Sequence, residues 1–277
     1  MQYIDLHVHT AASDGTKTPE ETVRYAMDKG LSAIAITDHD TVQGLPGALK
    51  EAEKFNFNLI PGIELTADYE GEEIHILGYN IDHTDRNLLE SLVSINLEKK
   101  ERNEKMYAQL NKAGIVITPV LMQIRYPDAI ITRGHIADYL VSRGYVEDTQ
   151  EAFSKFLGKT TPFFVPRDNI PAEFAIRLIL QSGGIPVLAH PLLYYDKNSD
   201  KLYRMTRSLK SMGLKGIEAI YPSHKGRAEG DMRRLAAHFG LFITGGSDYH
   251  GGLKKGLDMG SGYGNLKVPA DLLKNLI

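Results

Sequence analysis

Histidine and carboxylate side chains recur at short intervals in this chain, and both types bind transition metals. His7 and His9 alternate near the amino-terminal end, and Asp14 follows them closely. Imidazole and carboxylate ligands suit Zn, Mn and Fe alike, so the residue types alone predict a metal site without naming its metal. The chain has no cysteine, which excludes disulfides, thiolate metal sites and cysteine nucleophiles.

Ionisable residues also follow the other apolar runs, and seven of the ten histidines stand at such positions. The candidate metal ligands are His7, His9, Asp14, His39, Glu64, His75, His190, Asp248 and His250. A lone histidine on a strand is more often a hydrogen-bonded structural residue, and the segments around Asp38 and Asp248 could be plain polar turns. Together, however, six imidazoles and three carboxylates would be very costly to bury without cations, because unpaired and like-charged groups are each unfavourable. The set as a whole favours metal ions.

The elements that would position these residues alternate between strands and helices. Residues 4–9 alternate between apolar and polar side chains, which places His7 and His9 on one face of a half-buried strand. A capping box at residues 18–21 marks the start of the first helix. Further strands are expected at 33–36, 59–65, 74–78, 185–189, 216–220 and 241–244. In a parallel barrel all carboxyl ends open on one face, so the ionisable residues would converge there.

The sequence predicts the α/β class, with a distorted seven-stranded β/α (TIM-like) barrel and an inserted helical lobe. A chain of 277 residues is normal for one α/β barrel, although the usual prior is about 150 residues for each domain. The run Glu70-Gly71-Glu72 joins two strands directly, as in a hairpin, and this distorts the barrel. We expect a metal-binding barrel of residues 1–89 and 166–277, with residues 90–165 as a helical lid or substrate lobe.

Charge and hydropathy exclude several kinds of partner. The chain has 32 basic and 35 acidic residues, a net charge of −3, which removes the broad basic surface that non-specific nucleic-acid binding requires. It contains no run of 18 apolar residues and no leader-like start, so we expect no membrane partner and a cytoplasmic location. The sequence does not indicate an oligomeric state.

Six motifs, in order, resemble those of the PHP (polymerase and histidinol phosphatase) family of metallophosphoesterases. They are His7-x-His9 with Asp14, Thr37-Asp38-His39, Gly62-Ile63-Glu64, His75-Ile76-Leu77-Gly78-Tyr79, Ala189-His190-Pro191 and Ser247-Asp248-Tyr249-His250. The resemblance covers nearly the whole chain and implies a distorted seven-stranded barrel. Within the family, the chain is most similar to the branch of nucleoside 3′,5′-bisphosphate phosphatases and 5′→3′ exoribonucleases, since histidinol-phosphatase relatives commonly carry a histidine where Asp14 stands.

The resemblance also implies three divalent metal ions, with Mn, Zn or Fe as the candidates. The first would be held by His7, His9, Glu64 and Asp248. The second would be held by Asp14, His39 and His250. The third would share Glu64 and add His75 and His190.

Charge arithmetic supports a phosphate substrate. Three divalent cations and the carboxylates of Asp14, Glu64 and Asp248 leave three positive charges, which a phosphate dianion and a hydroxide would neutralise. Paired cations also suit in-line displacement. We therefore expect a metal-activated hydroxide to hydrolyse a phosphomonoester of a small nucleotide (a nucleoside 3′,5′-bisphosphate or an AMP-like molecule) or the 5′ end of short RNA. Asp38 and Asp40 are expected to orient the ligating imidazoles.

Candidate substrate contacts lie in two loops. Arg133 and His135 open a helix, where free N–H groups and a guanidinium favour phosphate, although a plain helix cap with a solvated arginine is the alternative. His224 follows the sixth strand and is a candidate for phosphate contact or leaving-group protonation, with Asp248 the other candidate catalytic residue. An ordinary surface loop is the alternative for His224. Arg167 lies near the expected mouth, with no role assigned.

Three other functions stay open at this point. The first is a phosphatase of another small metabolite, such as histidinol phosphate. The second is a non-catalytic metal-binding structural module, which the complete set of nine candidate ligands disfavours. The third is a zinc amidohydrolase, which shares the His-x-His start but usually ends in a single late aspartate, unlike Asp248-x-His250 here.

Overall fold

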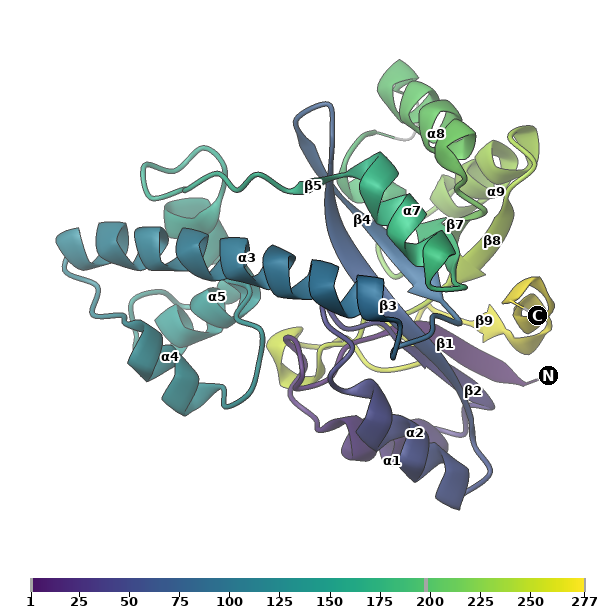
Figure 1. Ribbon diagram of the computed structural model, residues 1–277, viewed down its shortest axis with the longest axis horizontal. Coiled ribbons are helices and arrows are strands. Elements are labelled where there is room, and N and C mark those ends of the chain that lie inside the picture. Colours follow the sequence, from purple (N-terminus) through teal and green to yellow (C-terminus); the bar gives the residue numbers. More distant parts are fainter. Residues whose placement is uncertain (1, 197–198, 277) are drawn as a thin grey trace.

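The computed structural model describes residues 2–196 and 199–276 and shows a mixed α/β fold around a nearly closed, barrel-like sheet (Figure 1). The strands are β1 (Tyr3–Val8), β2 (Ala33–Ile36), β3 (Asn58–Tyr69), β4 (Glu72–Tyr79), β5 (Ile170–Pro171), β6 (Ile185–Leu188), β7 (Gly216–Ile220), β8 (Phe242–Gly245) and β9 (Val268–Pro269). Their order is β8-β7-β6-β4-β3-β2-β1-β9, and β5 pairs with β3. The described residues thus form nine strands, of which seven match the expected ranges. The other two have two residues each, too few to leave a periodic pattern in the sequence.

The hairpin expected at residues 70–72 is confirmed, and it determines where one candidate ligand lies. Strands β3 and β4 pair antiparallel over eight residue pairs, with Thr66 opposite His75. Glu70 and Gly71 both have positive φ, 52° and 83°, as the tight turn of a two-residue hairpin requires. Because β4 runs opposite to its neighbours β3 and β6, its first half lies at the end of the sheet where the parallel strands finish. His75, near the start of β4, therefore reaches the same end as residues that follow the other strands.

The segment after β8 closes the sheet against β1. The N–H of His9 donates to the carbonyl of Tyr249 at 2.9 Å, and the N–H of Tyr249 donates to the carbonyl of His7 at 3.3 Å. This pairing brings residues 247–250 beside residues 7–9, although they are separated by some 240 positions in the chain.

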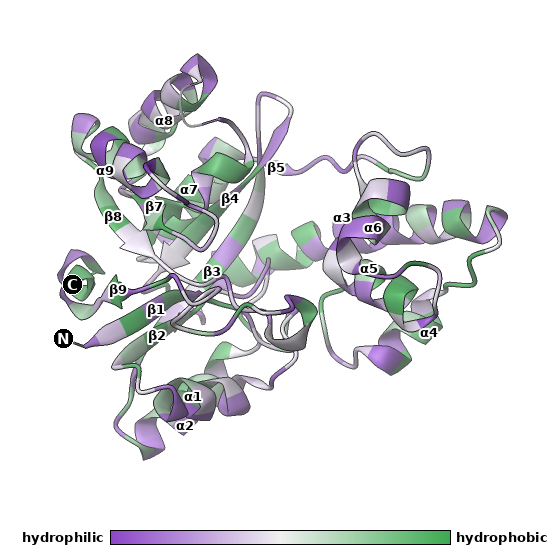
Figure 2. Ribbon diagram, turned by 180° about the vertical axis from the view of Figure 1, so that it is seen from behind, coloured by the Kyte–Doolittle hydropathy of each residue, from purple (hydrophilic) through white to green (hydrophobic). Residues whose placement is uncertain are grey.

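The helices are α1 (Pro19–Asp28), α2 (Leu45–Lys54), α3 (Arg86–Lys112), α4 (Pro119–Arg125), α5 (Arg133–Ser142), α6 (Thr149–Ala152), α7 (Ala172–Gln181), α8 (Asp200–Met212) and α9 (Ala228–His238). A π-helix at Phe153–Leu157 continues α6. The capping box expected at the start of α1 is confirmed, since Thr18 and Glu21 cap each other's backbone N–H groups. Figure 2 shows hydrophobic residues along β2 and α7, which belong to the buried core. None of the helices in the described ranges has the length and hydropathy to span a bilayer.

Helices α3 to α6 gather on one side of the sheet, and α3 connects them to it (Figure 1). Leu88, Leu92 and Ile95 in the first half of α3 belong to the main hydrophobic core. Met106 and Leu110 in its second half belong to a separate cluster built from residues 106–165. One continuous helix is therefore shared by two hydrophobic clusters.

Candidate metal centre

The structure brings all nine candidate ligands to the same end of the sheet. Each of them belongs to at least one group of three or four side chains whose nitrogen and oxygen atoms lie within 4.8 Å of one another. These groups are His9-Asp14-His39-His250, His7-Glu64-His190, His7-His9-Asp248 and His39-Glu64-His75. Residues as far apart in the sequence as His7 and His250 thus converge because the sheet closes on itself.

Glu64 of β3 lies at the centre of the cluster and is fully buried. Its Oε1 atom lies 2.9 Å from the Nδ1 atom of His75 and 3.0 Å from the Nε2 atom of His190. Its Oε2 atom lies 3.2 Å from one imidazole nitrogen of each of three further residues, His7, His9 and His39. One carboxylate therefore faces two sets of imidazoles, one with each oxygen.

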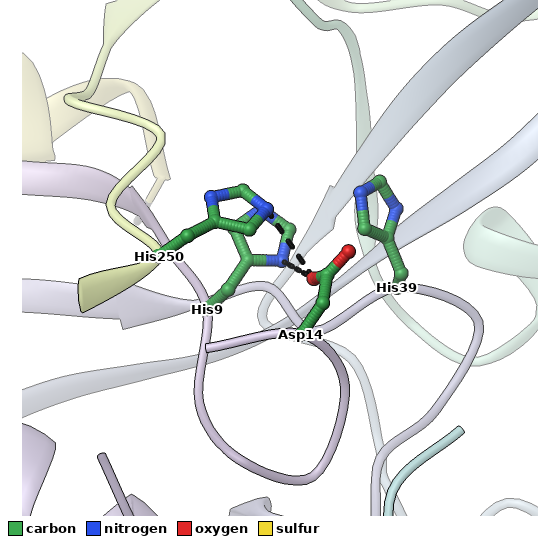
Figure 3. Close-up of side chains that lie close together, drawn as sticks. All are labelled: His9, Asp14, His39 and His250. Carbon is green, nitrogen blue, oxygen red and sulfur yellow. Dashed lines mark ion pairs between the residues drawn. The ribbon is translucent and has the colours of Figure 1, made fainter. Parts of the chain in front are cut away.

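A second set of side chains surrounds Asp14, which lies in the loop after β1 (Figure 3). Its Oδ1 atom lies 3.3 Å from the Nε2 atom of His250 and 3.7 Å from the Nδ1 atom of His9. His39 completes this group. Because the Nε2 atom of His9 faces Glu64, the His9 imidazole lies between the Asp14 and Glu64 groups.

Asp248 joins the cluster from the loop after β8. Its Oδ1 atom faces the Nε2 atom of His9 and the Nδ1 atom of His250, both at 3.3 Å. Its Oδ2 atom accepts hydrogen bonds from the Tyr221 hydroxyl at 2.7 Å and from Lys254 at 2.5 Å. The backbone of Asp248 is left-handed, with φ of 55°, a conformation that aspartate adopts more readily than most non-glycine residues.

The buried polar atoms of the cluster test whether metal ions fit it. Ten buried side-chain nitrogen or oxygen atoms in the described residues lack a hydrogen-bond partner, and five of them belong to candidate ligands. These five are His7 Nε2, His9 Nε2, Asp14 Oδ1, His39 Nδ1 and Glu64 Oε2. An unpaired buried polar atom typically costs about 1–3 kcal/mol, so five in one place are unfavourable unless a ligand satisfies them. Divalent cations would coordinate all five, and the donor set fits them.

The pKa shifts indicate that the carboxylate of Glu64 stays ionised. Burial opposes the ionisation of Glu64, but the imidazoles of His39, His7 and His75 outweigh it and hold the pKa of this carboxyl well below its usual range. Burial lowers the pKa of His39 to about 3, which leaves its imidazole neutral. Burial would also lower the pKa of His9, but the nearby carboxylates of Asp248 and Glu64 raise it to about 9. A proton and a cation compete for such a nitrogen.

Glu218 of β7 orients the imidazole of His7 and holds the backbone of His190, a role that the sequence did not reveal. Its Oε1 atom accepts a hydrogen bond from His7 Nδ1 at 3.0 Å, and its Oε2 atom accepts one from the backbone N–H of His190 at 2.8 Å. A carboxylate only accepts hydrogen bonds, so the Nδ1 atom of His7 carries the proton and its Nε2 lone pair faces the cluster. The hydroxyl oxygen of Tyr194 lies 2.9 Å from the Nδ1 atom of His190, so this ring is held at Nδ1 while its Nε2 atom faces Glu64.

Asp38 and Asp40 make other contacts than those expected. Asp38 accepts hydrogen bonds from the Thr10 backbone and hydroxyl and from the Ser13 hydroxyl, which itself lies 3.5 Å from His9 Nδ1. Asp40 accepts from Thr66 and pairs with Lys99 at 2.7 Å. The oxygens of both carboxylates are thus occupied by these partners rather than by an imidazole. Asp38 and Asp40 fix the loops that carry the candidate ligands.

A cavity of about 260 Å³ opens beside the cluster. His39, His75 and His250 contribute to its wall, and so do five basic residues, Lys99, Arg102, Arg133, Arg167 and Lys254. Thr132 connects α5 to the ligand cluster. Its hydroxyl donates to Asp14 Oδ2 at 2.8 Å, and its side chain also caps α5. The N-cap of α5 therefore contacts one candidate metal ligand directly.

The three expected substrate contacts lie in different surroundings. Arg133 lines the cavity and pairs with Glu73. His135 is buried, and its Nδ1 atom accepts a hydrogen bond from the N–H of Thr132 at 3.1 Å, which completes the cap of α5. His224 is buried too, and its Nδ1 atom donates to the carbonyl of Ala219 at 2.7 Å, while its Nε2 atom lacks a partner. Of the three, only Arg133 is among the described residues that line the cavity.

The fold and the cluster together define a class of protein, the metal-dependent hydrolases of phosphate esters. In such enzymes a buried set of imidazole and carboxylate ligands stands beside a cationic cavity for the phosphoryl group. The family model of the PHP domain matches residues 5–168, and the chain belongs to this family. The resemblance to it in the sequence motifs is thereby confirmed, as is the enzyme class, a metal-dependent phosphoesterase.

Relatives with known names cover most of the chain. A 3′,5′-nucleoside bisphosphate phosphatase from Chromobacterium violaceum is 33% identical over 265 residues, which are 94% of this chain and 91% of that protein. The 5′-3′ exoribonuclease Rnm from Escherichia coli is 34% identical over 260 residues, covering 89% of this chain and 84% of that protein. Among solved structures, a metal-dependent phosphoesterase from Bifidobacterium adolescentis superposes with a TM-score of 0.88 at 27% identity, covering 99% of this chain and 95% of that one.

Proposed function

We propose that this phosphoesterase hydrolyses a phosphomonoester of a small nucleotide, either a nucleoside 3′,5′-bisphosphate or an AMP-like molecule, or acts at the 5′ end of short RNA. The observation that carries the proposal is the group of five unpartnered, buried ligand atoms beside a cavity lined by basic residues. Relatives of about a third identity, a bisphosphate phosphatase and an exoribonuclease, support the nucleotide class.

We propose three divalent ions, Mn, Zn or Fe, held as the family resemblance implies. His7, His9, Glu64 and Asp248 would hold the first, Asp14, His39 and His250 the second, and Glu64, His75 and His190 the third. The contacts of Glu64 support its proposed sharing between the first and third sets, because Oε2 faces His7 and His9 while Oε1 faces His75 and His190. When bound, such ions supply Lewis acidity and lower the pKa of a coordinated water.

Asp248 and His224 are the proposed catalytic residues, with separate roles. Tyr221 and Lys254 hold Asp248 Oδ2, which aims Oδ1 at the imidazoles. Burial lowers the pKa of His224, and its Nδ1 proton is engaged by a carbonyl, so the Nε2 lone pair is free to accept. His224 would thus take up a proton at Nε2 before it could pass one to a leaving group.

Arg133 and the helical segment are proposed to select the substrate. The Arg133 guanidinium, fixed by Glu73, would contact a phosphate group in the cavity. His135 would act through Arg133, because the cap it completes sets the start of α5. We propose residues 1–89 and 166–277 as a distorted seven-stranded β/α barrel, and residues 90–165 as a lobe beside its mouth that limits substrate length.

The purified protein, loaded with Mn, would be assayed on 3′-phosphoadenosine 5′-phosphate, 5′-AMP, short 5′-phosphorylated RNA and histidinol phosphate, and its bound metal would be counted. We expect turnover of one or more of the first three and about three metal ions for each chain. Turnover of histidinol phosphate alone would overturn the nucleotide class. Less than one metal ion for each chain after reconstitution, with no turnover, would favour a structural module.

A further inference from the structure

Helix α3 carries a regular stripe of exposed side chains on the face opposite the core. Leu88, Leu92 and Ile95 turn inward and belong to the main hydrophobic cluster. The residues on the opposite face recur at alternating intervals of four and three, as in a heptad repeat. This α3 stripe consists of Arg86, Glu90, Val93, Leu97, Lys100 and Glu104, all of them exposed. It is about 27 Å long, at about 1.5 Å for each residue, and α3 crosses the near side of the molecule in Figure 1.

The centre of the α3 stripe is apolar. Val93 and Leu97 expose 71% and 56% of their surface, and Leu89 beside them exposes 41%. Single exposed apolar residues are ordinary on a protein surface, but Val93 and Leu97 occupy consecutive positions of the heptad pattern. Both also line a groove of about 380 Å³, to which Met122 of α4 contributes. A helix face with an exposed apolar centre in heptad spacing is suited to pack against another helix.

The charged residues of the α3 stripe lie on both sides of this centre. Arg86 and Glu90 precede it, and Lys100 and Glu104 repeat the same order of positive and negative charge after it. Arg86 pairs with Glu90 at 2.7 Å. Lys100 and Glu104 make no ion pair within residues 2–196 and 199–276, so both are available to a second molecule.

The order of the charges determines how two such stripes can pair. A parallel pair in register would place each charge against its like, which is unfavourable. An antiparallel pair, with a two-fold axis at the level of Ile95, places opposite charges together. The facing residues of the two copies are then Arg86 and Glu104, Glu90 and Lys100, and Val93 and Leu97. Beside the stripe, Glu101 comes near Asn87, so the flanks add no like-charged pair there.

We propose that two copies of this chain form a symmetric dimer by packing their α3 stripes antiparallel. Each contact occurs twice, because a two-fold interface uses the same surface of both copies. Four pairs of opposite charges therefore flank one apolar centre. The dimer does not depend on the proposed function.

Sedimentation velocity of the full chain would measure the fraction that has twice the chain mass of 30.8 kDa. A contact one helix wide lies at the small end of specific interfaces, so we expect half of the chains to pair at about 10–100 µM. Lys100→Glu places a carboxylate against Glu90 in both halves of the interface and should raise the dissociation constant at least about 10-fold. Glu90→Lys places an ammonium group against Lys100 and should weaken the dimer in the same way.

A mixture of these two variants gives the sharpest test, because each is repelled by its own copy and complements the other. In the mixed dimer the introduced lysine faces the introduced glutamate, and the original Lys100 faces the original Glu90. We expect the equimolar mixture to dimerise with a dissociation constant within about threefold of the wild type.

The matched control is Lys105→Glu, which makes the same charge change on an exposed residue of α3 outside the stripe. It should leave the dissociation constant within about threefold of the wild type. All three variants should keep the helix content of the wild type by circular dichroism, since the substituted side chains are exposed. A wild type that stays monomeric up to about 300 µM would overturn the dimer. So would a Lys100→Glu protein that dimerises as well as Lys105→Glu, or a mixture that dimerises no better than its components.

Discussion

Replacing Glu218 with glutamine tests whether this residue, which would not itself bind metal, controls the candidate metal centre. Both partners of its carboxylate are donors, the Nδ1–H of His7 and the backbone N–H of His190, at 3.0 Å and 2.8 Å. A glutamine of the same shape has one acceptor oxygen and one donor NH₂ group. Whichever way the amide turns, it leaves one of the two donors facing another donor.

The expected loss of metal affinity in Glu218→Gln follows from the loss of one hydrogen bond to a charged group. Such bonds contribute about 1.5–3 kcal/mol, and the loss includes the burial of an unsatisfied donor. At about 1.4 kcal/mol for each factor of ten, metal affinity should fall by roughly 10- to 100-fold, and kcat/KM should fall in parallel at limiting metal. Saturating metal should restore much of the activity, because the ligands themselves are unchanged.

Metal affinity would be measured by titration calorimetry, and kcat/KM at several metal concentrations. Tyr79→Phe is the matched control: it removes a buried hydrogen bond of 2.9 Å to the carbonyl of Leu6 within the sheet. It should lower the free energy of unfolding by about 1 kcal/mol and leave metal affinity unchanged. A Glu218→Gln protein whose metal affinity lies within threefold of the wild type would refute the orienting role.

Three further predictions concern the centre and its surroundings. His9→Ala should abolish turnover with little loss of helix content by circular dichroism, since His9 lies between two ligand groups, and activity above about a tenth of wild type would contradict its assignment. Removal of metal by a chelator should lower the unfolding temperature reversibly, because the buried ligand atoms lose their partner, and an unchanged temperature would count against bound ions. Burial lowers the pKa of His135 from 6.5 to about 4. Below pH 6.5 the unfolded chain therefore takes up a proton that the folded chain does not. The free energy of unfolding should fall by about 3 kcal/mol as the pH falls to 4. His135→Gln keeps a capping acceptor without titrating, and denaturant unfolding should then depend less on pH across this window.

The strands and helices around the sheet could be predicted because their signals are local. The alternation in residues 4–9, the capping box from Thr18 to Glu21 and the turn at Glu70-Gly71 each reflect the geometry of a few neighbouring residues. The convergence of His7, Glu64 and Asp248 could be expected too, since ionisable residues followed successive strands. Their partition among individual ions could come only from the family resemblance.

The basic wall of the cavity could not be predicted, because it depends on tertiary contacts. In the sequence, Lys99 and Arg102 stand in the charged run Glu98-Lys99-Lys100-Glu101-Arg102, which is typical of a solvent-exposed helix. In the structure, two of these five residues are buried against the cavity, and only the packing of α3 decides which two. Glu218 stands within the strand expected at 216–220, but the sequence does not show that it contacts the Nδ1 atom of His7.

The continuity of α3 couples the unfolding of the two hydrophobic clusters that pack on it. At about 1.5 Å for each residue, its 27 residues make a rod of about 40 Å. Leu88 and Leu92 are held at one end of this rod and Leu110 at the other, in different apolar clusters. If either end of α3 unfolds, the helix on which the other cluster packs is also destabilised. The amides of the two clusters should therefore lose protection from hydrogen exchange together rather than as separate cooperative units.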